Sequence, residues 1–220
     1  MTREIAGNVA RKIVENSNTP HSIPVLTYGI EIILNGLIKF IGLTTIGLAF
    51  GLLKELYIMA FIFGTFRTIT GGVHAQTFGR CFTISLGSFT ILALLIPYTV
   101  NWFMENAGTI FFISTLVGLV LIFRYVPGKW KGRKFTPERI KASKWAAFLF
   151  LFTILSLTWF AIHKPDQTWH HLSWAAFLGL YWQLFLVTPW GYKFVGFIEG
   201  PYTKEQGEMD NVRTSKRENS

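Results

Sequence analysis

The chain has 220 residues, of which half are hydrophobic and only 15% are charged. Soluble domains carry about 25% charged residues, so this chain has too few to cover an ordinary soluble globule. A single cysteine excludes a disulfide scaffold and a cysteine-rich metal site, and an aromatic content of 16% excludes general disorder. The net charge of +9 fits the basic cytoplasmic loops of a membrane protein, so we expect no nucleic-acid partner.

Six apolar stretches approach the roughly 20 residues that a helix needs to cross the hydrocarbon core. They are residues 28–50, 52–66, 81–100, 107–123, 145–162 and 172–190. The second stretch is the weakest, because it is short and has Lys54 and Glu55 near its start. Residues 1–24 lack the apolar run of a cleavable signal. We predict an all-α integral membrane protein with six transmembrane helices, forming one polytopic domain over residues 1–200.

The distribution of lysine and arginine predicts the orientation. With six spans and a cytoplasmic N-terminus, the inner segments are 1–27, 67–80, 124–144 and 191–220, and they contain 18 Lys and Arg residues. The outer segments contain only Lys54 and Lys164. Because positive residues near span ends resist translocation, we expect a multi-pass cell-membrane protein with both termini in the cytoplasm.

The two ends of the chain are polar but differ in pattern. Ile5, Val9 and Ile13 recur every four residues beside basic residues, which fits a short amphipathic helix over about 2–15 in the inner interface. A frayed polar leader fits equally well. Residues 201–220 carry mixed charges and are predicted to be a disordered cytoplasmic tail.

The inner segment around residues 66–81 carries the candidate chemistry. It contains the only cysteine, Cys81, with His74 seven residues before it, and glycines at 71, 72 and 79 that would let the stretch bend. Cys81 would open the third span, where helix N–H groups and the adjacent Arg80 favour a thiolate. His74 could accept the thiol proton.

A structural interpretation of the same residues stays open. A lone cysteine at a membrane boundary is often an inert small hydrophobe, and a loop histidine is often simply solvated. One cysteine and one histidine leave a zinc tetrahedron half empty, so we expect no metal.

Polar residues inside the spans form a second pattern. Glu31, Asn35 and Lys39 recur every four residues on one stripe of the first span. Glu31, at a depth similar to that of His74, could orient the imidazole as a third catalytic group. A Glu31–Asn35–Lys39 packing network, or a Glu31 side chain that extends to the interface, is the alternative. Gln183 in the sixth span is interpreted as an interhelical hydrogen-bonding residue.

Arg67, Gly72, His74 and Ala75, followed by Cys81, form a pattern that resembles the AgrB family. These are the membrane peptidases that process quorum-sensing propeptides in Gram-positive bacteria. The segment YGIEIILN at 28–35 is similar to the family's opening segment, and RYVPGKWKGRKFTPERIKASK at 124–144 to its basic cytoplasmic loop. With the six spans, the resemblance covers nearly the whole chain.

The resemblance implies a reaction and assigns residues to it. Cys81 would be the nucleophile and His74 its base, Arg67 would hold substrate or support an oxyanion, and Gly72 would have a backbone role. The substrate would be an AgrD-like propeptide with an amphipathic leader, a signal segment and an acidic tail. Cleavage through a thioester and ring closure to a thiolactone or lactone would need no cofactor.

The basic loop at 124–144 has eight Lys and Arg against one Glu. Lys129, Lys131, Arg133 and Lys134 at its centre would attract the acidic tail of the propeptide. The alternative is that they serve only membrane topology and contact with anionic lipid. Small residues in the spans would also permit a homodimer.

Two rival classes remain. A peptide transporter or a scaffold that presents the peptide is one, although transporters usually carry internal repeats and polar groups at mid-depth, where this chain has only Lys39 and Gln183. An intramembrane protease of another mechanism is the other. The paired aspartates or H-E-x-x-H motif that it would need are absent from the sequence.

Overall fold

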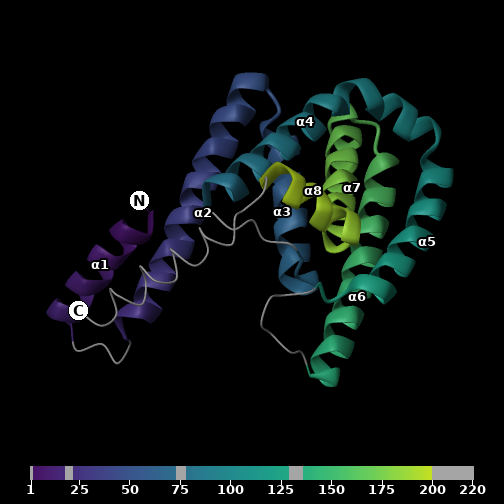
Figure 1. Cartoon of the computed structure of the whole chain (residues 1–220). Helices are drawn as coiled ribbons and strands as arrows, with labels where there is room; N and C mark the ends of the chain where they lie inside the picture. The colour runs from purple at the N-terminus through teal and green to yellow at the C-terminus, as the bar shows by residue number, and fades with distance from the viewer. Residues whose placement is uncertain (1, 18–21, 73–77, 129–135, 200–220) are drawn as a thin grey trace.

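A computed structural model gives the arrangement of the chain (Figure 1) and describes residues 2–17, 22–72, 78–128 and 136–199. Every regular element in these ranges is a helix, which confirms the predicted all-α class. The elements are α1 (Thr2–Asn16), α2 (Ile23–Phe50), α3 (Leu53–Thr70), α4 (Phe78–Glu105), α5 (Ala107–Tyr125), α6 (Pro137–Ile162), α7 (Gln167–Val187) and α8 (Pro189–Glu199).

Four of the described helices, α2, α4, α5 and α6, are long and apolar enough to cross a membrane. The α7–α8 pair, bent by 89°, meets the same criterion only when it is taken as one span. Large apolar side chains on these helices are exposed, including Ile33 at 70%, Phe112 at 68% and Phe123 at 71%. A hydrocarbon environment accounts for that exposure, so the chain is a multi-pass membrane protein with four to five apolar spans.

The predicted second span corresponds to α3, which does not reach the apolar criterion. Its 18 residues include Lys54 and Glu55 in the first turn and Arg67 in the last. The charges lie at the two ends, and the buried residues between them are apolar: Leu56, Met59, Ile62 and Phe66. Apolar helices long enough to span a membrane are therefore confirmed for α2, α4, α5 and α6, and for α7 if it is taken together with α8. The total of six spans, which needs α3 as well, stays a prediction.

The core forms where α3 packs along α7, the most extensive contact between two described helices. Residues buried in α7 point in every direction around the helix, since Ser173 to Phe177 are all buried. A Cβ on Gly179 would lie 2.6 Å from the Met59 carbonyl oxygen, so glycine is required for this close approach. Small residues at such crossings are typical of membrane helix pairs.

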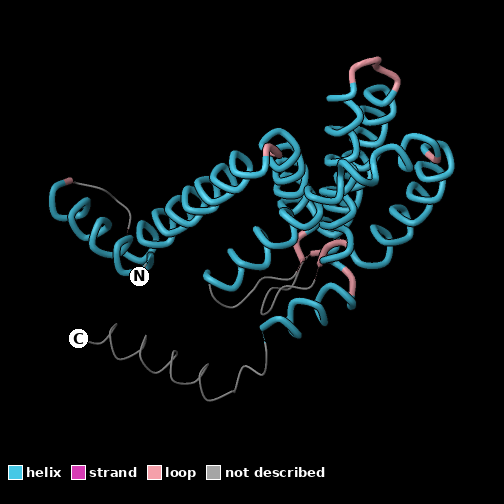
Figure 2. The backbone as a smooth tube through the Cα atoms, turned by 90° about the horizontal axis from the view of Figure 1, so that it is seen from above, coloured by secondary structure: helices cyan, strands magenta, loops and turns pink. Residues whose placement is uncertain are grey.

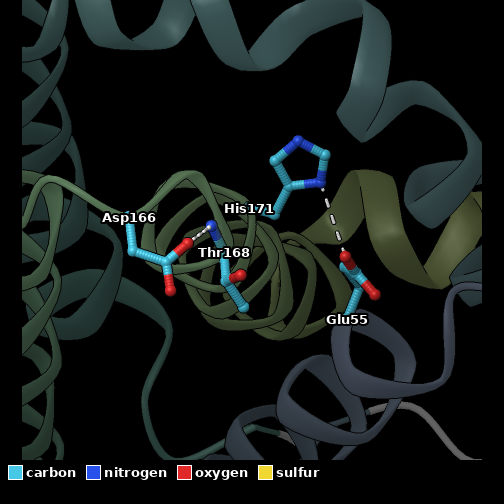
Figure 3. A network of polar contacts seen from close by, with 4 residues as sticks. All are labelled: Glu55, Asp166, Thr168 and His171. Atoms are coloured by element: carbon cyan, nitrogen blue, oxygen red, sulfur yellow. Dashed lines mark hydrogen bonds and ion pairs between the residues drawn. The ribbon is translucent and has the colours of Figure 1, made fainter.

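Contacts at both ends of the pair show that α3 and α7 run parallel. Near their first turns, the His171 Nδ1 lies 3.4 Å from the Glu55 carboxylate (Figure 3). Near their last turns, Gln183 Nε2 donates to Thr70 Oγ1 at 2.8 Å. These contacts are fifteen positions apart on α3 and twelve on α7, a rise of about 22 Å and about 18 Å along the two helix axes.

The neighbouring helices α4 and α6 run antiparallel to α3 and α7. The Trp174 Nε1 near the start of α7 donates to Thr99 Oγ1 near the end of α4 at 2.7 Å. Ser143 near the start of α6 donates to the Ile69 carbonyl at the end of α3. The bundle thus has a Cys81 end, where α3 and α7 finish and α4 and α6 begin, and an opposite His171 end.

The first two helices form an arm on one side of the bundle (Figures 1 and 2). In α1, Ala6 and Ala10 are buried, and α1 packs extensively on α2. Ile5, Val9 and Ile13 remain exposed. The helix ends one residue beyond the predicted range of 2–15. Its exposed apolar stripe suits the predicted interfacial position, which stays a prediction.

The end of the predicted sixth span, residues 172–190, differs from the structure. The helix ends at Val187, and the chain turns at Thr188 into α8. A Cβ on Gly191 would clash with the Phe185 carbonyl oxygen, so glycine lets α8 fold closely against α7. The predicted tail, residues 201–220, lies outside the described residues, and the division into a domain over 1–200 and a tail stays a prediction.

Candidate functional site

The chain leaves α3 through a tight turn made by Gly71 and Gly72. Gly71 N donates to the Arg67 carbonyl at 2.9 Å and closes the helix. The φ angles of Gly71 and Gly72 are 69° and 125°, which residues with a Cβ rarely adopt. The predicted bend at these two glycines is confirmed, whereas Gly79 lies inside α4.

Gln183 on α7 holds this turn. It is completely buried, and its Nε2 donates to the Gly71 carbonyl at 2.7 Å as well as to Thr70 Oγ1. Its Oε1 accepts from Arg67 Nη1 at 3.4 Å. The predicted interhelical role of Gln183 is confirmed, and through it one side chain joins α7 to the last turn of α3.

The segment after α5 supports the same turn from the other side. Gly128 N donates to the Thr70 carbonyl at 2.8 Å. A Cβ on Gly128 would lie 2.7 Å from both the N and the Cα of Gly72, so two backbones meet there without side chains between them. Sequence reasoning missed Gly128, because its partner lies 56 positions away.

Arg67 lies in the last turn of α3 and connects the turn to Cys81. Its guanidinium carbon is 5.7 Å from the centre of the Phe63 ring. The ionisable side chains of Cys81 and Tyr192 lie near enough that, in their charged forms, they would act on this guanidinium. The structure thus brings together Arg67 and Cys81, two positions of the motif that come from different helices.

Cys81 is the fourth residue of α4 and a free, half-buried thiol. The Lys39 ammonium, from the middle of α2, donates to its Sγ at 3.3 Å. The sulfur therefore lies beside a cation and near the N–H groups of a helix start, two features that attract negative charge. The predicted location of Cys81 near a helix N-terminus is confirmed, although the helix begins three residues earlier.

The three residues of the polar stripe on α2, Glu31, Asn35 and Lys39, have different surroundings in the structure. The Lys39 ammonium contacts Cys81, while the side-chain amide oxygen of Asn35 (Oδ1) is buried without a hydrogen-bond partner. A Glu31–Asn35–Lys39 network through that oxygen is therefore not formed. Glu31 lies two turns before Lys39, about 12 Å along the helix axis. Its predicted role beside the imidazole stays a prediction.

Five predicted site residues lie outside the described residues. They are His74 in the segment 73–77, and Lys129, Lys131, Arg133 and Lys134 in the segment 129–135. The roles proposed for them stay predictions. The described chain does reach both sides of the first segment, at Gly72 and Phe78.

The His171 end contains a second polar cluster (Figure 3). Asp166 Oδ1 accepts from the Thr168 backbone N–H at 2.9 Å, and this hydrogen bond holds the pKa of the exposed carboxyl below its usual value. Glu55, Thr168 and His171 line a cleft of about 430 Å³. This cleft lies at the far end of α7 from Gln183, so its residues do not complete the site at Cys81. Within the described ranges, no three His, Cys, Asp or Glu residues could hold a metal ion together.

Comparison with known proteins gives the family. The family model described as "Accessory gene regulator B" (AgrB) matches residues 6–187. A putative AgrB-like protein of Clostridium acetobutylicum is 28% identical over 173 residues, covering 78% of this chain and 77% of its own length. One of Clostridium beijerinckii is 27% identical over 167 residues, covering 74% and 76%. No solved structure matches. The family match extends over α1 to α7 and includes Arg67, Cys81 and Gln183, so the chain belongs to the AgrB family.

Proposed function

We propose that this protein is a membrane-embedded cysteine endopeptidase that cleaves and cyclises an AgrD-like propeptide. Membership of the AgrB family gives it a role in accessory gene regulator quorum sensing, with such a propeptide as its partner. The observation that carries the proposal is the setting of Cys81. This half-buried free thiol near the start of α4 has the Lys39 ammonium in contact and the Arg67 guanidinium within electrostatic reach.

The first step removes the acidic tail. His74 accepts the thiol proton of Cys81, and the thiolate attacks the carbonyl carbon that joins signal segment to tail. The tetrahedral intermediate collapses with cleavage of the C–N bond, and the imidazolium returns the proton to the leaving amine. The tail departs, and the signal segment remains bound to Cys81 as a thioester.

The second step closes the ring. A thiol or hydroxyl of the signal segment gives its proton to His74 and attacks the thioester carbonyl. The C–S bond to Cys81 breaks, which releases a thiolactone or lactone and restores the thiolate–imidazolium pair. An internal nucleophile held close can have an effective molarity of about 10^5 M or more, so cyclisation outruns hydrolysis.

Arg67 and Gly72 support this chemistry without forming covalent bonds. The hydrogen bond to Gln183 and the Phe63 ring hold the guanidinium near Cys81. A cation at that position stabilises the oxyanion that develops during attack, or a carboxylate of the substrate. Gly72 supplies the backbone conformation through which the chain passes from α3 towards His74.

We propose that the Cys81 end faces the cytoplasm of a Gram-positive bacterium. Near this end the described helices carry mainly basic residues, namely Arg67, Arg80, Arg124, Arg139, Lys141 and Lys144. Near the His171 end, Lys54 and Lys164 are accompanied by Glu55, Glu105 and Asp166. This asymmetry supports a cytoplasmic Cys81 end, with α2 to α7 as six alternating spans and both termini inside.

The basic segment at 129–135 is proposed to bind the acidic propeptide tail. It continues the basic surface of the Cys81 end, where anionic lipid would also be attracted. Association into a homodimer would be compatible with small residues on the spans, and it is not required by the chemistry at Cys81.

Co-expression with an AgrD-like propeptide tests the proposal. Peptides from cells and medium are weighed by mass spectrometry for the wild-type chain, Cys81→Ala and His74→Ala. The proposal expects a tail fragment and a cyclic signal peptide only with the wild-type chain. Membrane levels of each variant are measured as the control. Full-length propeptide that leaves the cell uncleaved would instead identify a transporter, and normal processing by Cys81→Ala would exclude the cysteine mechanism.

A further inference from the structure

We propose that Lys39 is a positioning residue for Cys81, whose ammonium holds the sulfur in its charged, nucleophilic form. The expected effect of Lys39 on propeptide cleavage rests on the proposed function. The expected effect of Lys39 on the reactivity of the Cys81 thiol is independent of it.

The geometry favours a direct electrostatic contact. The Lys39 Nζ lies 3.3 Å from the Cys81 Sγ, and both side chains are half-buried. On the same stretch of α2, Leu37, Phe40 and Ile41 are exposed, as expected for a face towards lipid. An ammonium in such a helix is costly unless it finds a partner. The sulfur of Cys81 is the partner that this structure provides.

Other charged groups also lie around Cys81. Arg67 on α3 acts on the sulfur through its charge, but its guanidinium is hydrogen-bonded to Gln183 and lies over Phe63. Tyr192 on α8 acts on Arg67. Arg80 precedes Cys81 on α4 itself. The Lys39 ammonium donates a hydrogen bond directly to the sulfur at 3.3 Å, and a thiolate has its charge concentrated on that atom.

The same contact acts in both halves of the proposed reaction. Before attack, the ammonium stabilises the thiolate, while the thiol proton resides on the base. In the thioester the sulfur is uncharged. When the ring closes, the C–S bond breaks and the electron pair returns to the sulfur, so the ammonium again stabilises the developing charge. Lys39 would therefore improve Cys81 as nucleophile and as leaving group.

The single cysteine makes a direct test simple, because any thiol label reports on Cys81. The full-length chain is purified in detergent micelles, and the rate of alkylation by iodoacetamide is measured from pH 6 to pH 10. The variants are Lys39→Met, which removes the charge, and Lys39→Arg, which keeps it. Lys54→Met at the His171 end is the matched control.

Lys39→Met is expected to react about tenfold more slowly at neutral pH, because less of the sulfur is ionised. It should regain the wild-type rate at high pH, where the thiol ionises unaided. Lys39→Arg should keep most of the neutral-pH rate, and Lys54→Met should match the wild type. A Lys39→Met profile that superimposes on that of the wild type would overturn the inference. A rate lowered equally at every pH would also overturn it, since that result indicates altered access to the sulfur.

Cleavage of the propeptide by the same variants separates the two proposals. With Lys39→Met, kcat should fall at neutral pH and recover as the pH rises, while KM stays unchanged. If alkylation shifts as expected but cleavage does not respond, the assignment of Lys39 stands and the proposed cysteine mechanism fails. If alkylation does not shift, the assignment of Lys39 fails whatever happens to cleavage.

Discussion

The side-chain amide of Gln183 donates to the Gly71 carbonyl at 2.7 Å, and so ties the last turns of α7 to the residue that follows α3. The same amide contacts Thr70 and Arg67. A buried amide with these partners fixes the point at which the chain leaves α3. It also fixes the guanidinium that lies near Cys81. The geometry of the candidate site therefore depends on a residue that takes no part in the proposed bond changes.

Replacement of Gln183 by Leu should destabilise the protein by about 1–3 kcal/mol, because buried groups at Thr70 and Gly71 lose their partner. The measurement is thermal unfolding in detergent, followed by tryptophan fluorescence. Gln167→Leu, at an exposed position of the same helix, is the control and should unfold like the wild type. Equal unfolding temperatures for Gln183→Leu and Gln167→Leu would contradict the assigned hydrogen bonds.

Alanine at Gly72 or at Gly128 should impair propeptide processing and lower stability. At Gly72 the φ angle of 125° is unfavourable for alanine, and at Gly128 the new Cβ would lie 2.7 Å from the Gly72 backbone. Gly87→Ala in α4 is the matched control, because a Cβ there meets nothing within 4 Å and alanine is a better helix former. Product masses and unfolding temperatures are compared. Wild-type behaviour of both Gly72→Ala and Gly128→Ala would show that the close approach is not needed.

The acid sensitivity of the His171 end should depend on Asp166. Its hydrogen bond from Thr168 lowers the carboxyl pKa in the folded protein. The stabilisation is therefore present above the pKa of the unfolded chain, and it is lost as the pH falls through the folded value. Asp166→Ala should unfold at a lower temperature than the wild type at neutral pH, and this difference should shrink in acid.

Asp166→Asn is the matched variant, since asparagine keeps an acceptor at the start of α7 without a titrating group. Asp166→Asn should unfold at a higher temperature than Asp166→Ala, and this difference should stay the same as the pH falls. If the difference between the wild type and Asp166→Ala stayed constant down to acid pH, the cap would not depend on the carboxylate charge.

Neutralising Lys129, Lys131, Arg133 and Lys134 with Gln should weaken propeptide binding and remove most of its salt dependence, because screening acts on charge pairs near the surface. The measurement is the KM of tail cleavage at low and high salt, with membrane insertion verified for each variant. Exchange of Lys54 and Lys164 for Gln at the opposite end is the control. Unchanged KM values and an unchanged salt dependence would leave this segment a role in topology and lipid contact only.

The sequence predicted the features that depend on local chemistry. Long apolar runs specify helices, and the family motif was recognisable from Arg67, Gly72, His74 and Cys81. The bend at Gly71 follows from its neighbour Gly72, and the interhelical bond of Gln183 follows from a polar side chain inside an apolar span. In each case one residue type in its local surroundings carries the information.

Features that depend on how distant helices meet could not be read from the sequence. The spacing of Glu31, Asn35 and Lys39 gives a common stripe, but which helix faces it depends on how α2 crosses α4, so the contact with Cys81 was missed. The separate helix α8 was also missed. The apolar run continues past Thr188, and the turn there depends on the close approach of Gly191 to Phe185.

The most direct measurement for the account is the mass of the protein caught during turnover. The purified chain is mixed with an AgrD-like propeptide whose cyclising Cys or Ser is replaced by Ala, and the reaction is quenched in acid. We predict that the protein gains the mass of the tail-less peptide on Cys81, that hydroxylamine removes this mass, and that Cys81→Ala gains none. Release of the tail by the wild-type chain without any adduct, or the same adduct on Cys81→Ala, would contradict a thioester on this cysteine.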